Sequence, residues 1–250
     1  MNLTHRSMKP SKPFTARPSL DSVKSVSHGR CMSDASWTEV DQFIEAKLLG
    51  SDAVLKAALE NNAANNLPPI DVSPALGKAL MLLAQMAGAR HILEIGTLGG
   101  YSTIWLARAL PANGRLLTLE VDRKHAGVAA ENLSRAGFSD KVEIRVGPAK
   151  DSLAAMQPAD PFDFVFIDAD KQGSANYVEE AIRLGRSGTT IIVDNVVRGG
   201  AIVDEANNDP RVAGTRRLYE HVSRHPRLNA TVLQTVGSKG WDGFLLAQVC

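Results

Sequence analysis

Short apolar segments alternate with helical patterns from residue 91 to the C-terminal end of this chain. Five of these segments have the length and composition of buried strands, and the stretches between them carry apolar residues at helical spacing. The predicted strands are 91–95, 115–120, 141–146, 162–168 and 189–194. The helices predicted after the first, second and fourth strands end near Leu110, Ala136 and Arg186. The helix after the third strand begins near Ala149, and the helix after the fifth spans 212–223. Regular alternation of this kind predicts an α/β fold with a doubly wound, mostly parallel sheet.

Two further strand-like segments, 228–236 and 244–249, follow the last predicted helix. The sequence Gly237-Ser238-Lys239-Gly240 lies between them, and no helical pattern separates them. Strands that are joined by a short turn pair antiparallel. We therefore expect an antiparallel hairpin at the C-terminal edge of the sheet.

Three helical patterns precede the first strand. Ser36-Trp37-Thr38-Glu39 has the form of a capping box, and apolar residues continue at helical spacing to about Leu49. Ser51 is expected to open a second helix, and Ser73-Pro74 a third that ends before Gly88. Residues 61–71 are predicted to form a loop. Residues 34–88 would then be N-terminal helices of one domain, 34–250, whose sheet occupies 91–249.

The first 33 residues differ in composition from the rest. Six Lys or Arg residues stand against one acid, Asp21, among many Ser and Pro residues. This composition predicts a disordered basic leader. It is also typical of an organellar transit peptide, although three prolines interrupt the amphipathic helix that such a peptide forms. A working protein that begins near Met32 accounts for the same composition.

The charges of the whole chain nearly cancel. It has 28 Lys and Arg residues against 27 Asp and Glu, so its charge favours neither nucleic acid nor an anionic membrane as partner. A small molecule is the expected partner. Cys31 and Cys250 are the only cysteines in the sequence, which fits a reducing compartment, and we expect the cytoplasm. No apolar stretch approaches the roughly 20 residues that span a bilayer.

A glycine-rich turn follows the first predicted strand, in the segment from Glu94 to Ser102. Glycines let a ligand approach the backbone, and the N-terminus of the next helix offers free N–H groups. The turn lacks the G-x-G-x-x-G spacing, and Glu94 would repel a pyrophosphate, so a cofactor with a cationic portion fits better. Glu120 ends the second strand, where a carboxylate can accept both hydroxyls of a ribose; Asp122 is a neighbouring alternative.

Carboxylates also end two later strands. Asp168 follows one apolar segment, and Asp194 with Asn195 follows the next. Because ligands bind outside the carboxyl ends of parallel strands, these three side chains are expected around one point. An oxygen-only donor set suits Mg²⁺ best, with Mn²⁺ or Ca²⁺ as alternatives, and leaves positions open for a vicinal diol.

Together these residues resemble the cation-dependent O-methyltransferases of the catechol and caffeoyl-CoA type, which use S-adenosylmethionine. The likeness covers roughly residues 36–249. Its most specific segments are Leu93–Thr97 with Gly100–Ser102, Phe166–Lys171, Asp194-Asn195 and Gly240–Gly243. The resemblance implies a Rossmann-like methyltransferase fold, a homodimer, and methyl transfer to a hydroxyl of a metal-chelated catechol-like or caffeoyl-type phenol.

The resemblance also implies roles for individual residues. Glu94, Gly96, Tyr101 and Ser102 would line the methionine side of the cofactor, Glu120 would hold the ribose, Ala149 would lie by the adenine, and Asp170 would contact the cofactor. Asp168, Asp194 and Asn195 would hold the metal. Lys171 is the candidate base, with Asp168 as its catalytic partner.

Other interpretations remain open at this point. An NAD-type oxidoreductase shares the sheet, but the glycine spacing and an obvious catalytic His or Tyr-Lys pair are missing. A nucleic-acid or amine methyltransferase would need an Asn/Asp-Pro-Pro-aromatic turn where Asp168–Lys171 stands. A non-catalytic cofactor-binding protein would not need the metal and base residues. Taken singly, Asp168 could cap a helix, Asp194 and Asn195 could form a turn, and Lys171 could be a solvated charge.

The substrate walls are expected from two loops, 61–71 and 196–204. Arg198-Gly199-Gly200 follows the metal residues directly and is predicted to be mobile. Arg198 could pair with an acidic substrate or simply be solvated. Trp241 could stack on an aromatic ring, although a Trp in a hairpin more often packs on the core or on a partner subunit.

Overall fold

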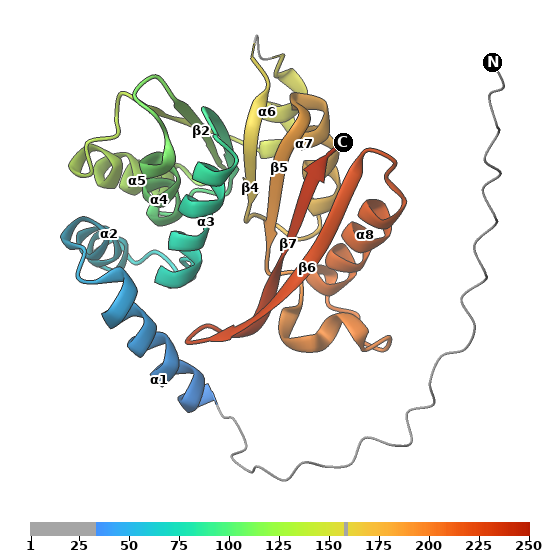
Figure 1. The fold of residues 1–250 in the computed structure, drawn as a ribbon, viewed down its shortest axis with the longest axis horizontal. Helices are drawn as coiled ribbons and strands as arrows, with labels where there is room; N and C mark the ends of the chain where they lie inside the picture. Colours follow the sequence, from blue (N-terminus) through green and yellow to red (C-terminus); the bar gives the residue numbers. More distant parts are fainter. Residues whose placement is uncertain (1–33, 158–159) are drawn as a thin grey trace, which may run out of the picture. The chain divides into compact units, whose positions relative to one another are not determined.

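The structure, a computed structural model, describes residues 34–157 and 160–250. The predicted basic leader, residues 1–33, lies outside the described residues, and so does the proposed start at Met32. Figure 1 shows the arrangement of the elements. In chain order they are α1 (Asp34–Ile44), the π-helical η1 (Glu45–Leu49), α2 (Ala53–Ala64), α3 (Pro74–Met86), β1 (His91–Ile95), α4 (Tyr101–Ala109), β2 (Arg115–Glu120), α5 (Arg123–Arg135), β3 (Val142–Val146), α6 (Ala149–Ala155), β4 (Phe162–Ile167), α7 (Ser174–Leu184), β5 (Gly185–Asp194), the 3-10 helix η2 (Arg198–Val203), α8 (Pro210–Arg224), β6 (Leu228–Gly237) and β7 (Gly240–Val249).

The seven strands form one sheet in the order β3-β2-β1-β4-β5-β7-β6. The first five are parallel, and β7 runs antiparallel to both β5 and β6. The predicted doubly wound sheet with an antiparallel C-terminal hairpin is therefore confirmed. The chain winds outward from β1 through β2 to β3, and then returns to β4 on the other side of β1. This reversal between β1 and β4 is where open α/β sheets bind ligands.

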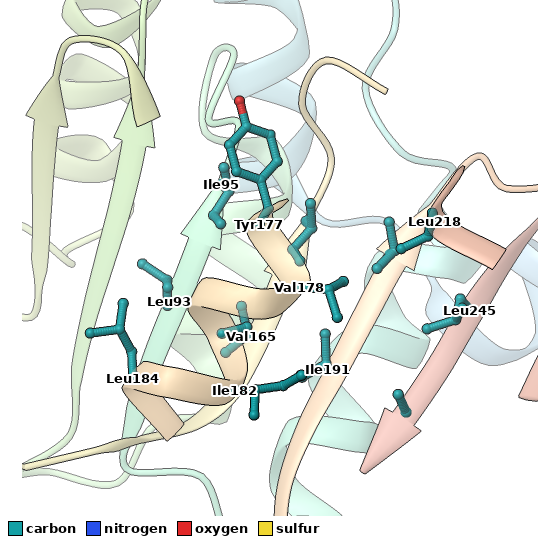
Figure 2. Close-up of a cluster of buried hydrophobic side chains, with 14 of the residues drawn as sticks. Leu93, Ile95, Val165, Tyr177, Val178, Ile182, Leu184, Ile191, Leu218 and Leu245 are labelled. Atoms are coloured by element: carbon teal, nitrogen blue, oxygen red, sulfur yellow. The ribbon is translucent and has the colours of Figure 1, made fainter. Parts of the chain in front are cut away.

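The central strands are apolar throughout because both faces of the sheet are covered. In β4, Phe164 and Phe166 pack on one face with residues of α3 and α4. Val165 and Ile167 point to the opposite face, where they meet α7 and α8. Figure 2 shows this second cluster, in which side chains of α7 such as Val178 and Ile182 lie over β1, β4 and β5.

Several predicted boundaries were wrong for identifiable reasons. Asp52, not Ser51, caps α2, because its Oδ1 accepts hydrogen bonds from the backbone N–H groups of Val54 and Leu55, both at 3.1 Å. This helix extends to Ala64, so the predicted loop begins later than residue 61. The predicted capping box at Ser36 lies inside α1 rather than at its start.

The C-terminal hairpin is longer than predicted. Strand β7 begins at Gly240 rather than at residue 244, and its pairing with β6 continues to the turn, where Gly237 lies opposite Gly240. The tip of this hairpin reaches α1, as Figure 1 shows, and Ser238 N–H donates to Asp41 Oδ2 over 2.7 Å. Strand β5 also begins earlier than predicted, at Gly185 rather than at residue 189, because Gly185 already pairs with Phe162 of β4, ahead of a shift in the register of the two strands.

In the described part of the chain, no helix has both the length and the apolar character that crossing a membrane requires. Cys250 is exposed with a free thiol.

Candidate active site

The turn after β1 and the end of β4 touch each other at Gly96. Gly96 has a φ of +99°, and a Cβ added there would lie 2.2 Å from the backbone oxygen of Asp168. Asp168 N–H in turn donates to the Ile95 carbonyl over 2.8 Å. Only glycine fits this conformation and this contact. The predicted cofactor turn and the predicted metal carboxylate are therefore adjacent.

Glu120 organises the glycine-rich turn from the end of β2. Its Oε2 accepts hydrogen bonds from the N–H groups of Thr97 at 3.1 Å and Leu98 at 2.7 Å, and its Oε1 accepts one from Asp122 N–H at 2.9 Å. The sequence did not indicate this support of the turn. The alternative residue, Asp122, caps α5 through Lys124 and His125 N–H groups and is committed to that helix.

Glu94 is fully buried behind the turn. Three hydroxyl groups donate to its carboxylate: Ser102 at 2.6 Å, Thr103 at 2.5 Å and Thr118 at 2.7 Å. Burial raises the pKa of Glu94 to about 7, although these hydrogen bonds oppose the rise. Near neutral pH a negative charge at Glu94 is therefore held in the wall of the site at a cost in stability.

This cost predicts how stability depends on pH. The folded protein binds a proton at Glu94 up to about pH 7, whereas an unfolded Glu releases it near pH 4.5, so Glu94 lowers stability progressively as pH rises between these values. Glu94→Gln carries no charge and should increase the free energy of unfolding at pH 8 by about 3 kcal/mol at most. Urea denaturation at pH 5 and pH 8 measures the difference, with Glu131→Gln on the surface of α5 as control. An equal effect at both pH values would contradict the assignment.

The predicted metal residues lie together at the ends of β4 and β5. Lys171 Nζ donates to Asp168 Oδ1 over 2.9 Å and to the backbone oxygen of Asp194 over 3.2 Å, so Lys171 joins the two strand ends. Asn195 follows with a φ of +55°, a left-handed conformation that Asn tolerates better than most residues, and turns the chain sharply after β5. Lys171 is itself buried and is not the solvated charge of the alternative interpretation.

A negative charge on Asp194 is costly even with Lys171 beside it. Asp194 is buried, and burial together with the charge of Asp168 raises its pKa to about 7, while Lys171 acts in the opposite direction. Two carboxylates and an amide oxygen at one place form a hard oxygen donor set. These residues therefore fit a divalent cation of the Mg²⁺ class.

The predicted cofactor residues near α6 and α7 reach the same place. Asp170 accepts hydrogen bonds from Tyr177 O–H at 2.5 Å and from Gly173 N–H at 2.8 Å, so it is fixed at the start of α7. Figure 2 shows the Tyr177 hydroxyl pointing away from the aliphatic cluster on which its ring packs. Ala149 is the first residue of α6, beside Pro148.

One cavity of about 720 Å³ connects these features, within the range for small-molecule sites. Its lining includes most of the predicted residues: Gly96, Tyr101, Ser102, Glu120, Ala149, Asp168, Asp170, Lys171 and Asn195. Glu94 and Asp194 are not part of the lining; each lies behind a residue that is, Ser102 and Asn195 respectively. Of the predicted substrate loops, Ile70, Asp71 and Arg198 reach the cavity.

Two supporting residues had no assigned role in the sequence. Asp242 Oδ1 accepts hydrogen bonds from the N–H groups of Val197 at 2.9 Å and Arg198 at 3.0 Å, which fixes the chain shortly after the predicted metal residues Asp194 and Asn195. Arg216 on α8 donates to backbone oxygens of the segment 201–207, among them that of Ile202 at 3.0 Å. In the sequence, Asp242 was noticed only as part of the Gly-Trp-Asp-Gly motif. The N–H groups that it binds lie 44 to 45 residues away. The Trp241 ring lies beside Gly200 outside the cavity, and its Nε1 donates to Gln234 Oε1.

Comparison with known proteins decides the family. Residues 46–248 match the O-methyltransferase family. The chain belongs to this family. This O-methyltransferase is 53% identical over 211 residues to a catechol O-methyltransferase of Mycobacterium tuberculosis, a match that covers 84% of this chain and 95% of the relative. It is 48% identical over 220 residues to a catechol O-methyltransferase of Niastella koreensis, covering 87% of this chain and all of the relative.

Solved structures agree with the assignment. An O-methyltransferase of Bacillus cereus in complex with SAH has a TM-score of 0.86 and 55% identity, covering 87% of this O-methyltransferase and all of that chain. TomG of Streptomyces achromogenes, an O-methyltransferase of tomaymycin synthesis in complex with SAM, has a TM-score of 0.84 and 45% identity, covering 87% and 99%. The fold of this O-methyltransferase is thus that of enzymes solved with the methyl donor or its product.

Proposed function

We propose that this enzyme transfers a methyl group from S-adenosylmethionine to one hydroxyl of a catechol-like phenol. The observation that carries the proposal is the contact at Gly96: the glycine-rich turn lies next to Asp168, and both line one cavity together with Asn195, which follows β5. The catechol O-methyltransferases among the relatives and the cofactor-bound neighbours support it. S-adenosylmethionine supplies an electrophilic methyl group on a positively charged sulfur.

The chain provides for such a cofactor along one wall of the cavity. The negative charge at Glu94 lies directly behind Ser102 and favours a cationic ligand. Glu120 and Ala149 lie further along, where ribose and adenine are proposed to bind, and Asp170 is held in place by Tyr177. Tyr101 and Ser102 open α4 and line the cavity, so this helix begins at the cavity wall, and the N–H groups of a helix's first turn have no partner within the helix.

At the other end, Asp168, Asp194 and Asn195 would hold a divalent cation. Such a cation, when bound, lowers the pKa of a phenol, whose ordinary value is about 10. Lys171 lies against the same strand ends and is proposed to accept or orient the phenol proton, while Asp168 fixes its Nζ. Holding the two reactants in one cavity contributes to the rate because it removes the entropy of bringing them together.

The test is methyl transfer from labelled S-adenosylmethionine to a matched set of phenols. Catechol should be methylated once, whereas phenol and guaiacol, which lack the vicinal diol, should react far more slowly. Identification of the mono-O-methylated product by mass spectrometry completes the test. Equal turnover of catechol and phenol would contradict a site that binds a chelating diol. If none of the phenols is methylated, catechol-like phenols are excluded as substrates.

Ribose recognition predicts a loss of cofactor affinity on changing Glu120. Glu120→Gln keeps the size of the side chain and removes the charge that hydroxyl groups would donate to. Its affinity for S-adenosylmethionine should fall by about 1.5–3 kcal/mol, the usual contribution of hydrogen bonds to a charged group. Isothermal titration calorimetry measures it, with Asp122→Asn as the matched control. If only the Asp122 variant weakens binding, the ribose contact belongs to Asp122.

Arg198 predicts a preference among catechols. Arg198 lines the cavity, and its guanidinium lies near Asp209 but makes no hydrogen bond to the residues that the structure describes, whereas the neighbouring Arg211 is held by Asp209 over 2.5 Å. A catechol that bears a carboxylate should therefore bind better than a neutral one. Arg198→Gln should raise KM for the acidic catechol by about tenfold or more and leave KM for catechol nearly unchanged. Arg211→Gln is the control; equal effects on both substrates would show that Arg198 is simply solvated.

A further inference from the structure

The side chains of one glutamate and two histidines, residue types that bind metals in many proteins, meet between α7 and α8. The proposed methyl-transfer site does not include these residues. His221 lies in the last turn of α8, His225 follows four residues later at its C-terminal end, and Glu179 projects from α7. Glu179 Oε2 lies 3.2 Å from His221 Nε2 and 3.4 Å from His225 Nε2. One possible ligand atom from each of the three side chains lies within 4.8 Å of the other two.

Hydrogen bonding does not account for this arrangement. The Nε2 atom of His221 is buried and has no hydrogen-bond partner among the described residues, despite its short distance to Glu179. A buried nitrogen without a partner costs stability, so another ligand for its lone pair would be favourable. His225 Nδ1 accepts a hydrogen bond from Arg227 N–H at 3.2 Å; that bond is exposed, and water can replace it when Nε2 binds a metal and Nδ1 carries the proton.

The two distances from Glu179 to the histidines match tetrahedral coordination. Zinc binds His nitrogen at about 2.0–2.1 Å and carboxylate oxygen at about 2.0–2.2 Å, and tetrahedral geometry then separates neighbouring ligand atoms by about 3.3–3.5 Å. The observed separations of 3.2 and 3.4 Å are close to this value. Two imidazoles and one carboxylate favour zinc over Mg²⁺ or Ca²⁺. We propose that Glu179, His221 and His225 form a second metal site, for Zn²⁺ or a cation of similar preference, with the fourth position open to water.

Such a site would join the two helices that support the loop carrying Lys171. Helix α7 begins three residues after Lys171. On α8, Gly214 packs so closely that a Cβ there would lie 2.4 Å from the Lys171 backbone oxygen. A cation that bridges Glu179 to His221 and His225 ties α7 to α8 and should stabilise the folded protein in proportion to its occupancy.

The experiment uses Co²⁺ as a spectroscopic probe, followed by Zn²⁺. Tetrahedral Co²⁺ with imidazole ligands absorbs strongly in the visible range, whereas octahedral Co²⁺ bound by oxygen absorbs weakly, so the two metal sites are distinguishable. Metal-free full-length protein titrated with Co²⁺ should develop the intense bands, and Zn²⁺ should remove them. The bands should persist in Asp194→Asn, which alters only the oxygen site. His221→Asn should abolish them, and Glu179→Gln should weaken Co²⁺ binding by at least about tenfold.

Two control variants carry the same changes elsewhere. His91→Asn removes a histidine outside the cluster, and Glu220→Gln removes an acid from α8; both should retain the bands. Weak absorption in the wild-type protein, or intense bands that survive both His221→Asn and Glu179→Gln, would overturn the proposal. Glu179 is about half exposed, so its substitution tests the site even if a histidine variant fails to fold.

Discussion

Removal of divalent cations should reduce methyl transfer to a catechol by a factor on the order of 10³ or more. Phenols are largely protonated and poor nucleophiles at neutral pH, and the several kcal/mol that a Lewis acid contributes would be lost. Dialysis against EDTA followed by addition of Mg²⁺ or Mn²⁺ should abolish and restore turnover. Full activity after exhaustive chelation would contradict the metal assignment.

Asp194→Asn should produce a comparable loss that added Mg²⁺ does not restore. Asparagine has the same shape and can still accept the hydrogen bond that Asn195 N–H donates to Asp194 Oδ1 over 2.8 Å, so the turn after β5 should survive. Calorimetry should show S-adenosylmethionine binding close to that of the wild type. Asp140→Asn, at an exposed position between α5 and β3, is the matched control and should have wild-type turnover.

Lys171→Met should lower kcat by a factor of about 10²–10⁴, the usual contribution of a general base. Methionine keeps the length of the side chain and removes the amine that lies 2.9 Å from Asp168 Oδ1. The remaining activity should rise with pH, because hydroxide can replace the amine. Cofactor affinity should change little.

A substrate with an acidic phenol separates proton transfer from positioning. Nitrocatechol is already ionised to a large extent at neutral pH and should lose much less activity in Lys171→Met than catechol does. If both substrates lose the same factor and the pH profile keeps its shape, Lys171 acts by joining the ends of β4 and β5, and the base assignment is wrong.

The parts of the fold that could be predicted are those in which local sequence and final environment agree. Residues 162–167 read as a buried strand because both faces of β4 are covered, and its carboxyl end places Asp168 in the site. The order of the glycine turn and the two carboxylate endings likewise indicated the site, because parallel topology brings strand ends together.

The rest depends on contacts between residues far apart in sequence. Ser51 and Asp52 are both good helix caps, and the choice of Asp52 is supported by Arg108 on α4, which forms an ion pair with it at 2.6 Å. Asp242 supports the chain after Asn195 across 44 to 45 residues. Glu120 was assigned to a ligand, yet its carboxylate also binds three backbone N–H groups, and no pattern in the strand indicated that.

The contact between Gly96 and the backbone oxygen of Asp168 has a consequence for substrate range. Under the proposed assignment, the turn that would hold the methyl donor and the carboxylate that would hold the cation of the acceptor are joined by this one backbone contact, and not by the loops 65–72 and 196–204. If that assignment holds, changes in these two loops should leave the contact between Gly96 and Asp168 intact. We then expect that exchange of these loops changes which phenols the enzyme accepts more than it changes the rate of methyl transfer.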